Sequence, residues 1–228
     1  MSTRFASIIS LIGIVVLAAY VAWMYPSLPD PMPTHWNAAG EVDGWSSKPL
    51  GAAIIGGMAL YSFLIFKIIP VISPRGFRTE SFRGTINILM TATVTFSCIF
   101  GIGAIRGAMD ESINTSTFMS VAVGMLLVVM GNFLGKVRKN FFLGIRTPWT
   151  LASDEVWAKT HRLGGWCLVV SGLFMIVMAI VGGNILWALY AMAAGGLIPV
   201  VYSYFAYQNI EGFGPDPKIE DEQTLAND

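Results

Sequence analysis

The stretch GWCLVVSGLFMIVMAIV-GGN-ILWALYAMAAGGLIPVVYSYFAY occupies residues 165–207 and consists of two long apolar runs around a three-residue turn. A bilayer core of about 30 Å is crossed by roughly 20 apolar helical residues. Neither run contains a charged side chain. Each run therefore predicts a transmembrane helix, and the turn at residues 182–184 makes the two helices a tight antiparallel hairpin.

Four further apolar runs come earlier in the chain, at residues 8–24, 50–69, 84–105 and 117–134. The second is expected to end at Pro70, because proline lacks the amide that continues a helix. The first could be a cleaved signal peptide, but it is long for one and no good A-x-A site precedes Tyr25-Pro26. We therefore expect a retained anchor and an all-α polytopic membrane protein with about six transmembrane helices.

The composition agrees with a membrane protein. Of the 228 residues, 54% are hydrophobic and only 12% are charged, whereas soluble domains carry about 25% charged residues. The formal net charge is zero, so the charge balance gives no sign of direct nucleic-acid binding. Both cysteines, Cys98 and Cys167, lie inside apolar runs, which favours small buried hydrophobes over a disulfide, a metal site or a redox centre.

The orientation in the membrane is predicted from the distribution of lysine and arginine. If six helices alternate, ten of these cations fall on one side and two on the other, without counting Lys67 and the tail. Cytoplasmic loops carry the excess of positive charge. Both termini are therefore expected in the cytoplasm, with the loop at residues 25–49 facing outward.

The outer loop is rich in proline and tryptophan. Four prolines between residues 26 and 33 fix φ and remove backbone donors, so its start should be extended and stiff. His35, Glu41 and Asp43 could in principle surround a cation, but their spacing matches no known metal pattern. We therefore expect a rigid cap with solvated acids and no metal.

The loop at residues 131–166 combines positive charge with many asparagine, tryptophan, threonine and histidine residues. Ser153 is a good N-cap, so a helix is expected to start there, with Trp157 and His161 on one face, and to run into the fifth transmembrane helix. The chain before Pro148 should be extended. The positive-inside bias alone would explain the cations, but not the other residues. We therefore predict a functional surface that binds lipid phosphates or an acidic partner.

The helix interiors are otherwise poor in polar groups. They contain no aspartate or glutamate, so a proton-coupled pump would lack its usual relay. Asn132, at the end of the fourth apolar run, is expected to tie helices together.

Two motifs carry a resemblance to a known family. The first motif resembles the signature of the SdpI-type bacterial immunity proteins. It consists of residues 131–133, 140–142, 144–150, 153, 156–157, 160–162 and 164–165. The outer loop, with residues 28–29, 33–37, 40, 43–44 and 48, resembles the DUF1648 module. The resemblance implies a DUF1648-like module at 1–70, with outer loop 25–49, and an SdpI-like membrane core at 71–208. Residues 209–228 form an acidic, polar tail with too little apolar content to fold alone, so this tail is expected to be disordered.

What the family implies is a multi-pass protein of the bacterial cytoplasmic (inner) membrane that protects its host from a secreted toxic peptide. Its founding member is also implied to signal, by holding a small DNA-binding repressor at the membrane. No catalytic residue or cofactor is implied. The residues expected to face a partner or a lipid headgroup are Asn140, Arg146, Thr147, Pro148, Trp149, Trp157, His161 and Arg162. Those expected to face the toxin are Pro33, His35, Trp36, Asn37 and Trp45.

Two other functions remain open. A small transporter or flippase for peptide or lipid is weakened by the missing intramembrane acids and the missing G-x-x-x-x-G-K-[ST] loop. A membrane-embedded enzyme would need a nucleophile–base pair or a metal cluster at lipid depth, and the sequence offers neither. A receptor-like immunity protein is the function we favour, with the bilayer, a toxic peptide and a repressor as its partners.

Overall fold

The computed structural model describes residues 1–37, 41–77, 79–110 and 114–214. It contains six helices that are long and apolar enough to cross a membrane, which confirms the polytopic all-α class. The six are α1 (Thr3–Met24), α2 (Lys48–Ile72), α3 (Arg83–Met109), α4 (Thr115–Leu134), α6 (Asp154–Ile180) and α7 (Ile185–Ile210).

Smaller elements complete the fold. The short helix α5 (Pro148–Ala152) precedes α6, and 3-10 turns occupy η1 (Tyr25–Ser27) and η2 (Glu80–Phe82). The strands β1 (Met32–Trp36) and β2 (Val42–Ser46) form an antiparallel hairpin in the loop between α1 and α2. The prolines predict an extended start to this loop, but they do not predict the strand pairing.

The helix boundaries follow local signals, with one exception. The Ser153 hydroxyl accepts from the Val156 amide at 3.3 Å, and α6 then continues without a break, so the predicted cap and long helix are confirmed. The prediction that the second helix stops at Pro70 is wrong, since α2 continues to Ile72. One missing amide in the last turn removes a single hydrogen bond, and this does not end the helix.

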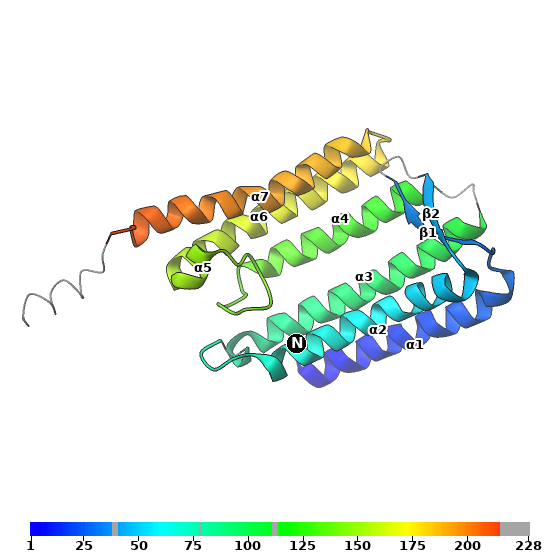
Figure 1. The fold of residues 1–228 in the computed structure, drawn as a ribbon, viewed down its shortest axis with the longest axis horizontal. Helices are drawn as coiled ribbons and strands as arrows, with labels where there is room; N and C mark the ends of the chain where they lie inside the picture. The colour runs from blue at the N-terminus through cyan, green and yellow to red at the C-terminus, as the bar shows by residue number, and fades with distance from the viewer. Residues whose placement is uncertain (38–40, 78, 111–113, 215–228) are drawn as a thin grey trace, which may run out of the picture.

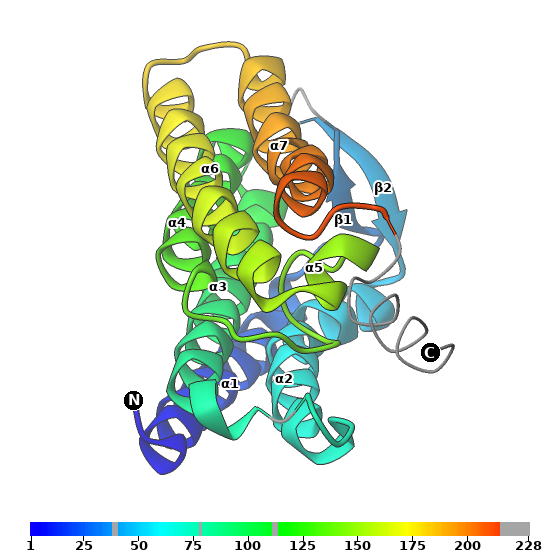
Figure 2. The same cartoon turned by 90° about the vertical axis from the view of Figure 1, so that its left-hand side faces the viewer.

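The long helices form two groups of three. Helices α1, α2 and α3 pack on one another, α4 and α7 both pack on α6, and contacts between α3 and α4 join the groups. Figure 1 shows α1–α3 in the lower part of the view, α6 and α7 in the upper part and α4 between them. Figure 2 shows α5 beside α6 and α7.

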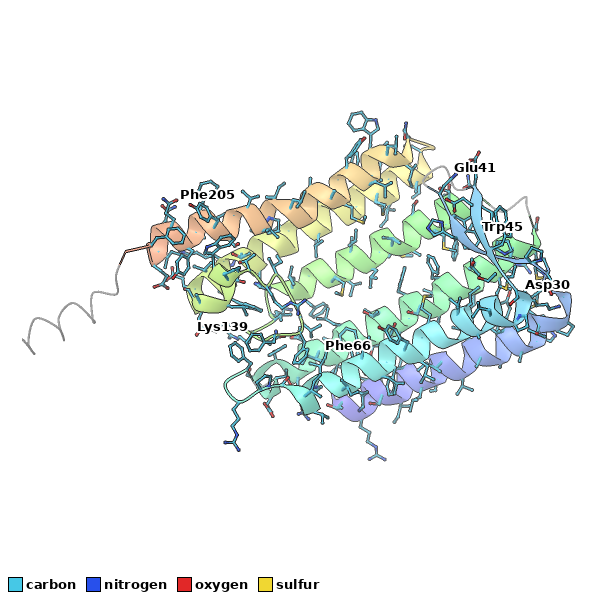
Figure 3. All side chains as sticks on the ribbon, in the orientation of Figure 1. Asp30, Glu41, Trp45, Phe66, Lys139 and Phe205 are labelled. Carbon is cyan, nitrogen blue, oxygen red and sulfur yellow. The ribbon has the colours of Figure 1, made fainter. Side chains whose placement is uncertain are left out.

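Successive helices alternate in direction, which gives the bundle two distinct ends. The hairpin end carries β1 and β2 and the turn between α6 and α7 (Figure 1). The loop end carries the N-terminus, the connection from α2 to α3 and the loop at residues 135–153. Asp30, Glu41 and Trp45 accordingly lie at the hairpin end, and Lys139 and Phe205 at the loop end (Figure 3).

Four glycines bring the backbones of α4 and α6 into contact. A Cβ atom on Gly131 would lie 2.5 Å from the Gly165 carbonyl oxygen, and one on Gly124 would lie 2.7 Å from the Gly172 carbonyl oxygen. In each helix the two glycines are seven residues apart, so they share one face. Packing of this kind holds membrane helices together without a hydrophobic driving force.

Two sequence predictions concern polar segments next to this core. Asn132 is exposed, and its amide donates to the Val128 carbonyl of its own helix at 2.8 Å. The prediction that it ties helices together is therefore wrong, because it lies beside the α4–α6 contact rather than in it. Of the predicted tail at 209–228, residues 215–228 lie outside the described part of the chain, while α7 continues to Ile210.

Candidate functional site

The loop between α4 and α5 is organised around Asn140, which is fully buried. Its side-chain amide donates to the carbonyl oxygens of Arg138 (2.8 Å) and Leu143 (3.0 Å). Its side-chain oxygen accepts from the amides of Phe142 (2.8 Å) and Leu143 (2.7 Å). A single side chain thus satisfies four backbone groups and fixes the turn of the loop.

His161 joins this loop to α6. Its Nε2 accepts from the Ile145 amide at 2.9 Å, and its Nδ1 donates to the Trp157 carbonyl oxygen at 2.8 Å. These partners require a neutral imidazole with its proton on Nδ1. Gly144 makes the approach possible, because its φ is +106° and a Cβ there would lie 2.2 Å from Nε2.

Trp157 supports the same connection from one helical turn away. Its ring stacks on the His161 ring with centroids 4.0 Å apart, and its Nε1 donates to the Val137 carbonyl oxygen at 2.7 Å. Both rings are buried. The face of α6 predicted to carry these two residues is therefore present, but it points into the protein.

Helix α5 is tied to α7 by hydroxyl groups. Thr147 and Thr150 form a reciprocal capping box around the start of α5, and Thr150 also donates to the Ile145 carbonyl oxygen at 2.8 Å. The Thr147 and Ser203 hydroxyls lie 3.0 Å apart. Thr147 is extended, as expected for a residue before proline.

The predicted partner-facing residues thus divide into two groups. Arg146, Pro148 and Arg162 are exposed and Trp149 is half-buried, so they can contact a partner or a lipid. The other four are buried and act on the shape of the loop, which corrects their expected place on its surface. These buried residues are Asn140, Thr147, Trp157 and His161.

Arg146 also takes part in a contact between the two helix groups. Its guanidinium donates to the Phe141 carbonyl oxygen. The Phe141 ring lies against the ring of Phe77, which comes from the connection between α2 and α3, with centroids 4.1 Å apart. The loop end therefore contains a direct link between the N-terminal and C-terminal groups.

At the hairpin end, β1 and β2 pair with an irregular register in which Pro33 faces Trp45 and His35 faces Gly44. The side chain of His35 contacts the carboxylate of Asp43, and Asn37 donates to Glu41 at 3.0 Å. The two predicted acids, Glu41 and Asp43, are thus exposed, and each contacts a side chain of the same loop. Within the described ranges, no group of three His, Cys, Asp or Glu side chains could hold a metal ion.

A cavity of about 550 Å³ lies under this hairpin, between it and the nearby ends of α3, α4, α6 and α7. The hairpin side of the cavity is lined by Thr34, His35, Trp36 and Asn37. Two of the residues predicted to face the toxin, Pro33 and Trp45, do not line it. The helices contribute apolar walls and a few hydroxyls. These lining residues are Phe100, Thr115, Ser116, Met119, Ser120, Val123, Met175, Ile185, Leu189 and Met192.

This cavity is not evident from the sequence. Its one signal was the presence of a methionine near the corresponding end of three predicted helices, at positions 119, 175 and 192. Methionine side chains adapt to irregular apolar partners and are common at binding surfaces of broad specificity. The cavity is therefore suited to apolar groups that enter from the hairpin end.

Comparison with known proteins identifies both motifs. The model of the SdpI/YfhL protein family matches residues 136–203, from the start of the Asn140 loop to the serine that contacts Thr147. This region of the chain is similar to the SdpI/YfhL family. The domain of unknown function DUF1648 matches residues 12–60, which include the hairpin.

A curated relative covers most of the chain. The immunity protein SdpI of Bacillus subtilis (strain 168) is 26% identical over 191 residues, which are 83% of this chain and 89% of that protein. No solved structure matches the chain. The protein is therefore a multi-pass membrane protein similar to an immunity protein, and this similarity favours a non-catalytic role.

Proposed function

We propose that this chain is an immunity protein of the bacterial inner membrane that protects its cell from a secreted toxic peptide. The observation that carries the proposal is the similarity to SdpI over 83% of the chain, together with the match of the SdpI/YfhL model to residues 136–203. The cavity under the hairpin is the place where apolar groups of such a peptide would bind. It combines apolar walls with a polar rim from β1.

Deletion of the gene in its native host tests the proposal even when the toxin is unidentified. The deletion strain should lose viability in medium conditioned by the parent strain, and a plasmid copy of the gene should restore survival. Equal survival of the deletion and parent strains in conditioned medium, and in mixed culture, would contradict an immunity function.

The cavity makes a more specific prediction about residues on α7. Leu189 lines the cavity, whereas Leu186 is exposed on the same helix and does not line it. Leu189→Trp should fill the cavity and reduce protection by roughly tenfold, because a misplaced apolar contact costs about 1–3 kcal/mol. Leu186→Trp is the matched control and should protect as the wild type does. Survival is compared at equal protein level, and equal effects of the two variants would argue against the cavity as the binding site.

The proposed orientation places the hairpin end outside the cell. In a background without Cys98 and Cys167, a cysteine at the exposed hairpin position Glu41 should react with a membrane-impermeant maleimide in intact cells. A cysteine at the exposed position Lys159, at the loop end, should react only after permeabilisation. The reverse pattern would invert the proposed topology.

Signalling, if this chain performs it as well as protection, would use the loop end. Arg146→Ala should then reduce the membrane recruitment of a tagged repressor encoded beside the gene, while protein level and survival under toxin change less. Trp36→Ala and Trp45→Ala should reduce survival first. Survival under toxin and membrane recruitment of the repressor are measured for each variant. If every variant lowers both by the same factor, the protein acts as a single packed unit with no separate signalling surface.

A further inference from the structure

A second cavity, of about 220 Å³, lies at the loop end between the last turn of α4 and the neighbouring part of α6. Gly131 and Gly165 form its base, because their backbones touch there and no side chain fills the space. Lys136, Arg162 and Trp166 line its sides. It is distinct from the cavity under the hairpin, which lies at the other end of the bundle.

Among the residues that the structure describes, the cations of this groove have no acidic partner, although the Lys136 ammonium lies over the Phe133 ring, 4.6 Å from its centroid. In the described part of the chain, no carboxylate forms an ion pair with Lys136 or Arg162. Two nearby cations do have acidic partners: Lys139 pairs with Asp154 at 2.7 Å and Lys159 pairs with Glu155 at 2.8 Å. The positive-inside rule explains the presence of cations at this end, but not the arrangement around one groove of two cations that lack a carboxylate partner.

An apolar stripe on α6 leads away from the groove. Four apolar residues follow Arg162 at intervals of three or four positions, so they lie with it on one face of the helix. They are Trp166, Val170, Leu173 and Val177. All four apolar residues are more than half exposed. From Trp166 to Val177 the stripe is about 16 Å long, at 1.5 Å per residue, which is about half of a 30 Å hydrocarbon core.

We infer that this groove binds the headgroup of an anionic phospholipid. The phosphate lies between Lys136 and Arg162, where two cations can bind it without competition from a carboxylate. An acyl chain follows the exposed stripe of α6 through one leaflet, and Trp166 lies at the interface, where tryptophan is enriched. The stripe favours a lipid over a soluble acidic partner, because a soluble partner would not reach it. This inference is independent of the proposed immunity function.

Lipid titration of the purified full chain in detergent tests the inference. Phosphatidylglycerol should raise the melting temperature and bind at least tenfold more tightly than phosphatidylcholine with the same acyl chains, as measured by native mass spectrometry. Glycerol phosphate should have no effect at the same concentrations, which distinguishes a lipid from a free phosphate. The double variant K136Q/R162Q should weaken phosphatidylglycerol binding roughly tenfold, because both attractive charges are lost.

The matched control is Lys159→Gln, which removes an exposed cation of the same helix that is already paired with Glu155. It should bind phosphatidylglycerol as the wild type does, and K136R/R162K should restore most of the affinity. Phosphatidylglycerol with a photoreactive acyl chain should label the peptide that contains residues 162–177. Each of four results would overturn the inference. The two lipids could bind equally, or Lys159→Gln could lose as much phosphatidylglycerol affinity as K136Q/R162Q. Glycerol phosphate could displace the lipid, or labelling could be confined to α1 and α2.

Discussion

Replacing Gly131 with alanine is expected to remove most of the folded protein from the membrane. The new Cβ would lie 2.5 Å from the Gly165 carbonyl oxygen, and the neighbouring obstacle is backbone rather than a flexible side chain. Helices α4 and α6 must then separate, which also disturbs the Gly124–Gly172 contact on the same face. Overpacking of a tight site costs about 1–3 kcal/mol or more. Membrane accumulation and the melting temperature in detergent measure the loss.

The matched control is Gly196→Ala. Gly196 is exposed on α7, and a Cβ there would meet no atom within 4 Å. Alanine favours a helix over glycine by about 1 kcal/mol, so this variant should accumulate at least as well as the wild type. If Gly131→Ala accumulates and melts like Gly196→Ala, the close backbone contact does not hold the two helices together.

The membrane helices could be predicted from the sequence because each is a nearly continuous apolar run with a polar end. The N-cap at Ser153 was equally local, since it depends on residues within one helical turn. The hairpin was missed because its pairing depends on Gly44 opposite His35, where a Cβ would lie 2.8 Å from the histidine Cβ. Helix α5 was missed although Thr147 before Pro148 is a recognised start signal.

The sequence singles out the residues of the loop, but it does not show which of their side chains are buried. The loop residues singled out by sequence do form one unit, but His161 bonds to Ile145 across 16 positions and Trp157 bonds to Val137 across 20. Composition cannot show that such polar side chains are turned inward. The cavity under the hairpin was beyond prediction for a related reason, because its walls come from four helix ends and a strand.

Replacing Asn140 with leucine is expected to unfold the loop at residues 136–146 while the six long helices persist. The substitution removes all four hydrogen bonds of a fully buried side chain, and each unsatisfied buried backbone group costs about 1–3 kcal/mol. Local opening relieves this cost, because Lys136, Arg138 and Arg146 already lie at or near the surface. The contacts between α4 and α6 do not involve Asn140, so the helical core should remain.

Limited proteolysis with trypsin in detergent measures this opening, since Lys136, Arg138 and Lys139 are cleavage sites within the loop. If opening becomes easier by about 3 kcal/mol, cleavage should accelerate by roughly a hundredfold. Asn132→Leu is the matched control, because Asn132 is exposed and bonds only to its own helix. Helical content by circular dichroism should stay unchanged in both variants. Equal cleavage rates for Asn140→Leu and Asn132→Leu would show that the four hydrogen bonds do not hold the loop, whereas loss of helical content in Asn140→Leu would show that the loop and the helical core unfold together.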